Sequence, residues 1–192
     1  MPETLIITKI LDAAQNRMVK FGYRKVTMDE IAGDLGMSKN TIYKYFTGKE
    51  EIAKSLVNRL EQKINESLGK IEKTEKDPLK IFTESILLLR KQLGPWFEYF
   101  FKEIPSELPS LWEEFLRYRN EKILGIQSLV EKGIKKGIFR KINAPIAVQA
   151  YLGTVKAIVN HKFLEQEKIS FDQALDAVLD IWANGILKKG TK

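Results

Sequence analysis

The sequence predicts an all-α protein of about nine helices. Apolar residues recur at three- and four-residue steps along nearly the whole chain, as on one face of a helix. Residues that start and stop helices border these stretches, and no stretch keeps the apolar–polar alternation of a strand. With 192 residues, 44% of them hydrophobic and 30% charged, the chain has enough apolar material for a packed core.

The first 50 residues contain signals for three short helices and the start of a fourth. Gly22 suits the end of the first helix. The run Thr27–Glu30 has the form of a capping box that opens the second helix, Gly36 ends that helix, and Ser38 caps a third. The apolar face of the first helix consists of Ile6, Ile7, Ile10, Leu11, Ala14, Met18 and Phe21.

The rest of the chain predicts longer helices. Thr47–Glu50 could form another capping box, and Pro78 suits the first turn of a later helix. Three prolines, Pro95, Pro105 and Pro109, interrupt one aromatic segment. The expected helices are Glu50 to Lys73, Pro78 to Gly94, Leu111 to Lys136, Pro145 to Leu164 and Phe171 to Lys188.

Composition excludes several classes of site. The chain has no cysteine and one histidine, so it offers no disulfide, thiolate metal site or cysteine nucleophile, and it contains no glycine-rich phosphate loop. We therefore expect neither an enzyme nor a bound cofactor or metal. The start shows no signal-peptide pattern, and the longest aliphatic run, Ile86–Leu89, is too short to span a membrane. A chain without disulfides suits the reducing cytoplasm, where we expect it to reside.

Residues Met28 to Thr47 predict two helices joined by a tight turn. Ile31 and Leu35 lie one turn apart on the first helix, and Ile42 with Tyr45 or Phe46 faces back from the second. Gly36 lies in the turn, where a positive φ angle suits glycine. This is the helix-turn-helix arrangement, in which the second helix enters the major groove of DNA.

The outward face of that second helix is basic, hydrogen-bonding and aromatic. A helical wheel places Lys39, Asn40, Tyr43 and Lys44 together, with Thr41 at the boundary. Asparagine can read adenine edges, and lysine can read guanine or hold a phosphate. The alternative is an ordinary solvated face. The net charge of +7 does not decide between the two, since residues 1–60 hold ten basic and seven acidic side chains.

The run VTMDEIAGDLGMSKNTIYKYFTGKEEI, Val26 to Ile52, resembles the DNA-binding domain of TetR-family transcriptional regulators. The preceding KILDAAQNRMVKFGYRKVT, Lys9 to Thr27, resembles that family's first helix, and the likeness covers roughly residues 8 to 55. Asn40 departs from the pattern, since the family often has glycine there. The resemblance implies phosphate contacts by Thr27, Tyr43, Tyr45 and Lys49, and base contacts by Lys39, Asn40, Thr41 and Lys44.

The resemblance also implies a division at residue 48. Residues 1–48 would be the three-helix DNA-binding domain, and residues 49–192 a larger helical domain for ligand binding and dimerisation. The helix from Glu50 to Lys73 would join the two. TetR relatives dimerise through their last two helices, which form a four-helix bundle with those of the partner.

The last two helices carry apolar and small residues that suit such a dimer. Packing within one chain explains the same pattern equally well from periodicity alone. The expected interface residues are Ala147, Ala150, Thr154, Ala157, Leu175, Val178 and Trp182.

The segment from Pro95 to Tyr118 is rich in aromatic residues, which suit either a ligand pocket or a core. In TetR relatives the inducer pocket lies in this neighbourhood. The expected pocket residues are Trp96, Phe97, Phe100, Phe101, Trp112, Phe115, Tyr118 and Tyr151.

Together these features predict a homodimeric, ligand-responsive DNA-binding regulator. We expect a repressor that leaves a double-stranded DNA operator when a small apolar or aromatic inducer binds. The alternative is an all-α module that binds apolar ligands without regulating DNA binding. It predicts ligand binding that leaves DNA affinity unchanged.

Overall fold

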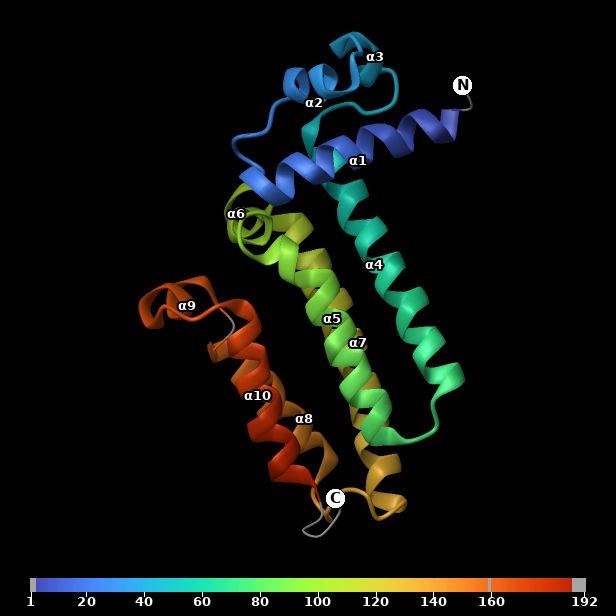
Figure 1. Ribbon diagram of the computed structural model, residues 1–192, viewed down its shortest axis with the longest axis vertical. Coiled ribbons are helices and arrows are strands. Elements are labelled where there is room, and N and C mark those ends of the chain that lie inside the picture. The colour runs from blue at the N-terminus through green and yellow to red at the C-terminus, as the bar shows by residue number, and fades with distance from the viewer. Residues whose placement is uncertain (1–2, 159, 188–192) are drawn as a thin grey trace. The chain divides into compact units, whose positions relative to one another are not determined.

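The computed structural model describes residues 3–158 and 160–187, and these residues form ten α-helices (Figure 1). The all-α prediction is confirmed for this part of the chain, where extended pairing is limited to one isolated bridge between Phe139 and Leu187. The helices are α1 Glu3–Phe21, α2 Met28–Leu35, α3 Lys39–Tyr43, α4 Lys49–Thr74, α5 Pro78–Phe97, α6 Phe100–Glu107, α7 Pro109–Lys135, α8 Ala144–Ile158, α9 His161–Glu167 and α10 Phe171–Ile186.

The described residues divide into two compact units. The first comprises residues up to Lys63 together with Pro95–Leu116, and the second comprises Ile64–Gly94 together with the chain from Arg117 onward. The boundary between these units at residue 63 falls within α4, which runs unbroken across it. A functional boundary near residue 48 stays a prediction.

The first unit contains the helix-turn-helix. Ile10 of α1, Ile31 of α2 and Ile42 of α3 are fully buried, and Phe46 after α3 is 4% exposed. Phe46 rather than Tyr45 therefore completes the small core expected from the sequence, since Tyr45 is only half-buried.

The aromatic segment contains the end of α5, all of α6 and the start of α7, and its rings up to Phe115 pack on one another within the first unit. Its prolines predict breaks between helices, but Pro95 lies inside α5 and Pro105 inside α6. Phe100 is fully buried, Phe101 stacks on Phe115 with centroids 4.6 Å apart, and Trp96 meets Phe100 edge to face at 5.2 Å. Such pairs stabilise a core beyond the area that they bury.

The second unit has its own core, built from α5, α7, α8 and α10. Phe82, Tyr151 and Trp182 pack together, with the Phe82 and Trp182 ring centroids 4.3 Å apart. The indole N–H of Trp182 donates to the carbonyl of Ala147 at 2.9 Å, which joins α10 to α8. Burial raises the pKa of Tyr151.

Two predicted boundaries were wrong. The helix expected from Pro145 to Leu164 is two helices, because Asn160 caps α9 by accepting a hydrogen bond from the backbone of Phe163. In place of the capping box expected at Thr47–Glu50, the Glu51 carboxylate accepts from the backbone and hydroxyl of Thr47, and α4 begins at Lys49. Lys188, the expected end of the last helix, lies outside the described residues.

Candidate nucleic-acid interface

Local hydrogen bonds fix both ends of the turn between α2 and α3. The hydroxyl of Thr27 accepts from the backbone N–H of Glu30, and the Glu30 carboxylate accepts in return from the backbone N–H of Thr27. Gly36 ends α2 with φ at 59°, the left-handed conformation that glycine adopts without steric cost. Ser38 then caps α3 by accepting from the backbone N–H of Thr41. These are the caps that the sequence predicted.

Helix α3 turns a polar face to solvent. Lys39, Asn40, Tyr43 and Lys44 are exposed, whereas Ile42 is fully buried. This exposure matches the outward face that the helical wheel predicts. Contact between these side chains and DNA stays a prediction.

Two hydroxyls expected to meet DNA already have partners in the chain. Thr27 donates its hydroxyl hydrogen to the carboxylate of Glu30 at 2.9 Å. The hydroxyl of Thr41, a half-buried residue, lies 2.8 Å from that of Ser38. Donation to a phosphate would require the Thr27 hydroxyl to exchange its partner, whereas the Ser38–Thr41 bond can form with either hydroxyl as the donor.

Lys49 is expected to contact a phosphate, but its ammonium already has partners within the chain. Its ammonium donates to the backbone carbonyl of Tyr23 at 2.9 Å and lies 4.1 Å from the centre of the Tyr23 ring. The pKa of Lys49 is lowered chiefly because burial disfavours the charged form, and the carboxylates of Glu107, Glu103 and Glu30 oppose that shift. The DNA-free structure thus holds the lysine on the loop between α1 and α2.

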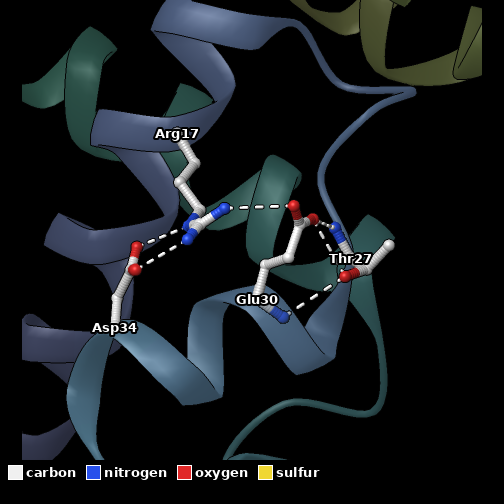
Figure 2. A network of polar contacts seen from close by, with 4 residues as sticks. All are labelled: Arg17, Thr27, Glu30 and Asp34. Atoms are coloured by element: carbon white, nitrogen blue, oxygen red, sulfur yellow. Dashed lines mark hydrogen bonds and ion pairs between the residues drawn. The ribbon is translucent and has the colours of Figure 1, made fainter.

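A polar network ties α2 to α1 (Figure 2). The guanidinium of Arg17 on α1 pairs with the carboxylate of Asp34 through both Nε and Nη2, the second at 2.7 Å. Its third nitrogen, Nη1, lies 3.1 Å from the carboxylate of Glu30, the residue that caps α2. A bidentate arginine–carboxylate pair has a defined geometry, so the network sets the orientation of α2 on α1.

Sequence reasoning missed this network. Arg17 and Asp34 are 17 residues apart, on helices that meet only in the folded chain. Each looks like an ordinary solvated charge in the sequence. The Thr27–Glu30 spacing was the one part that a sequence signal could reveal.

The loop between α1 and α2 is also attached to α6. The backbone N–H of Arg24 donates to Glu103 at 2.8 Å, and the Arg24 side chain donates to Glu107 at 2.6 Å. Gly22 has φ at 85°, and an added Cβ would lie 2.8 Å from the Glu103 carboxylate. A side chain at residue 22 would therefore disturb this contact as well as the backbone.

Comparison with known proteins identifies this domain. A family model for bacterial regulatory proteins of the tetR family matches residues 10–56, the segment from α1 into α4 that carries the geometry above. Residues 10–56 are therefore similar to the DNA-binding domain of tetR-family regulators.

Relatives extend this TetR likeness over most of the chain. It is 24% identical to the uncharacterized HTH-type transcriptional regulator YvaF of Bacillus subtilis, over 88% of this chain and 90% of that protein. It is also 24% identical to the fatty acid metabolism regulator protein of the same organism, over 94% and 95%. A solved structure, a putative transcriptional regulator from Saccharomonospora viridis in complex with choline, has a TM-score of 0.77 at 18% identity, covering 97% of this chain and 100% of that one. This last likeness concerns the fold.

The residues expected to line a TetR inducer pocket fall into both units. Trp96, Phe100, Phe101, Trp112 and Phe115 form the aromatic cluster of the first unit, to which Phe97 also belongs by position. In the second unit, the hydroxyl of Tyr118 donates to Asn65 at 3.1 Å, and Tyr151 is buried beside Phe82 and Trp182. Ring-on-ring packing accounts for the burial of most of them, so their contact with a ligand stays a prediction.

The residues expected at the dimer interface differ in their exposure to solvent. Ala147, Leu175, Val178 and Trp182 are buried within one chain. Ala150 and Ala157 are exposed on α8, and Thr154 is half-buried. Packing inside the second unit accounts for the first four, which leaves the α8 residues as accessible candidates for a partner.

Glu30 gives the α1–α2 network a dependence on pH. Its pKa is lowered from an ordinary value of 4.5, first by the hydrogen bonds from Thr27 and further by Arg17. A carboxylate with a lowered pKa stabilises the folded state fully above its unfolded value and loses that contribution as the pH falls through its folded value. We expect unfolding stability, measured by urea titration between pH 7 and 3, to fall less steeply below pH ~4.5 in Glu30→Gln than in the wild type.

The matched control is Glu84→Gln, which neutralises an exposed glutamate on α5. It should retain the wild-type slope. Equal slopes in the wild type and Glu30→Gln would mean that the capping carboxylate does not couple stability to pH.

Proposed function

We propose that the protein is a ligand-responsive transcriptional repressor that binds an operator in double-stranded DNA and leaves it when a small apolar or aromatic ligand binds. The observation that carries the proposal is the exposed face of α3, Lys39, Asn40, Tyr43 and Lys44, on a TetR-family helix-turn-helix. These side chains take no part in the core. Repression suits the family, and because the proposed partner is DNA, we propose a cytoplasmic location.

We further propose distinct roles for residues on this face. Asn40 can donate to and accept from an adenine edge, so it is assigned to base reading. Lys44 is exposed at the end of α3 and is assigned to a phosphate or guanine. Tyr43 and Tyr45 are assigned to phosphates, which set position and affinity rather than sequence preference. Because the chain offers no cysteine and a single histidine, we infer no catalytic activity.

Substitutions of Asn40, Tyr43 and Lys44 should separate base preference from overall affinity for DNA. Asn40→Ala should weaken discrimination at one or two base pairs by about 1–3 kcal/mol for each lost contact. Tyr43→Phe should weaken binding to all sequences alike, because it removes a phosphate contact. Lys44→Ala should lower the magnitude of the salt slope by about one per protomer if it contacts a phosphate. Mobility shifts against selected and scrambled duplexes, repeated across salt concentrations, measure all three.

Wild-type protein that showed no salt-sensitive, sequence-preferring DNA binding would exclude the proposed function. An unchanged base preference in Asn40→Ala would exclude base reading by that residue alone.

We propose that a second copy of the chain packs against α8 and α10. Two recognition helices are needed because one reads few base pairs, and paired half-sites lie about one turn of DNA apart. The support is an apolar surface that the chain's own packing leaves open, with Ile146 65% exposed on α8 and Ile181 64% exposed on α10. Small or apolar exposed residues continue each helix at three- and four-residue steps: Ala150, Gly153 and Ala157 on α8, and Ala177 and Gly185 on α10.

A charge at this surface should break the dimer and leave the chain folded. Ile181→Glu should shift the mass measured by light scattering from dimer to monomer at micromolar concentration and weaken operator binding. Leu124→Glu is the matched control, because Leu124 is 68% exposed on α7, a helix that is not part of the proposed face. Dimers that persist in Ile181→Glu, or dissociate equally in Leu124→Glu, would contradict this assignment.

We propose that the inducer has a mainly apolar body and a hydrogen-bond donor. Two relatives supply support by name, one regulating fatty acid metabolism and one solved with choline. Within the second unit, the side-chain oxygen Oε1 of Gln92 on α5 is buried without a hydrogen-bond partner among the described residues, while its amide nitrogen donates to Ser67 of α4 at 3.2 Å. Unpaired buried acceptors are costly, so a ligand donor that met this oxygen would gain affinity.

A panel of apolar probes that carry a donor tests the ligand proposal: a long-chain fatty alcohol, a fatty amide and an aromatic alcohol. At least one should raise the melting temperature and weaken operator binding by about fivefold or more, the lower end of ordinary allosteric coupling. Gln92→Leu should weaken the response to that probe and leave DNA affinity without ligand unchanged. A probe that binds without altering DNA affinity would favour the alternative, a module that binds apolar ligands independently of DNA.

A further inference from the structure

The carboxylate of Asp29 holds the ammonium of Lys39. The distance from Lys39 Nζ to Asp29 Oδ2 is 2.8 Å, and the bond joins the first turn of α2 to the first residue of α3. Both side chains are exposed, Lys39 to 45% and Asp29 to 68%. The pair therefore lies on the outward surface, and one of its members is an expected base-reading residue.

The fold does not depend on this pair. Exposed ion pairs contribute little to stability because water screens them and long side chains lose freedom. Thr27 and Glu30 already cap α2, and Ser38 caps α3. What the pair changes is the position of Lys39 and the charge that it presents.

An acid on this surface has an electrostatic disadvantage. It repels phosphates, from which most of the affinity of a DNA-binding protein comes. An ammonium carries three donors, however, so Lys39 can keep its bond to Asp29 and still donate to another acceptor. A lysine held in this way is directed to one acceptor, whereas an unrestrained lysine can reach any nearby phosphate.

Two other cations of the first unit differ from Lys39 in their partners. The side chain of Lys44 is exposed and has no hydrogen bond or ion pair among the described residues. Arg59 of α4 pairs with Asp12 of α1 at 2.7 Å, but that pair joins two scaffold helices. Asp29–Lys39 differs from both because it acts on a side chain of the recognition helix.

We propose that Asp29 is a positioning residue that determines sequence specificity by holding Lys39 toward a base-edge acceptor, such as guanine O6 or N7, and away from phosphates. This inference rests on the proposed DNA-binding function. Asp29 touches no base itself and acts through Lys39.

The experiment compares affinities for two duplexes, one enriched from a randomised pool by the wild-type dimer and a scrambled one of equal composition. In Asp29→Asn, affinity for the scrambled duplex should rise severalfold. The ratio of the two affinities should fall by about tenfold, as expected for the loss of one base contact. The salt slope should steepen by up to ~0.9 per protomer if Lys39 moves to a phosphate.

A double-mutant cycle distinguishes positioning of Lys39 by Asp29 from direct repulsion between Asp29 and the DNA phosphates. In the Lys39→Gln background, Asp29→Asn should leave the affinity ratio unchanged within about twofold, since Asp29 then has no ammonium to direct. Asp12→Asn is the control, because it neutralises an exposed aspartate that pairs with Arg59, outside α2 and α3 but in the same unit. It should retain the wild-type ratio and slope.

The outcomes distinguish a failure of the role of Asp29 from a failure of the proposed DNA-binding function. If the pool yields no preferred sequence, the proposed function fails, and the role of Asp29 fails with it. If the wild type shows a preference and Asp29→Asn keeps the same ratio, the role of Asp29 alone is wrong. An equal drop in the ratio with and without Lys39 would also overturn it, because Asp29 would then act independently of the lysine.

Discussion

The candidate interface depends on the burial of Ile42. A helix of five residues cannot persist in water by itself, because its nucleation cost exceeds what so few hydrogen bonds return. Ile42 is fully buried with Ile31 of α2, and Phe46 covers the same core from beyond the helix. That packing fixes the rotation of α3, and the rotation decides that Lys39, Asn40, Tyr43 and Lys44 face solvent.

Ion pairs between α2 and its neighbouring helices also organise the candidate interface. Helix α2 carries Asp29, Glu30 and Asp34, three acids beside a surface proposed to meet a polyanion. Each has a cationic partner: Lys39 for the first, and Arg17 for the other two. The acids of α2 therefore act as orienting groups for α1 and α3 rather than as unpaired negative charge.

Signals that act over a few residues predict the turn between α2 and α3 correctly. They fail where a proline lies inside a helix or where a side chain packs against residues distant in the sequence. The Thr27–Glu30 box, Gly36 and Ser38 act over four residues or fewer, and all appear as predicted. Helix α6 was missed because Pro105 reads as a breaker, although the buried rings of Phe100 and Phe101 hold that segment helical. The residues expected at the dimer surface included four that pack within the chain, because periodicity reveals an apolar face and not what covers it.

The sequence by itself determined the all-α class, the helix-turn-helix and the outward chemistry of α3, because helix period and capping are local properties. Tertiary structure alone decided which partners the polar side chains have. Arg17 pairs with Asp34, Lys49 donates to the carbonyl of Tyr23 in the α1–α2 loop, and Lys39 donates to Asp29, each between different elements of the fold. An ion pair depends on where two helices bring their side chains, and no spacing along one helix contains that information.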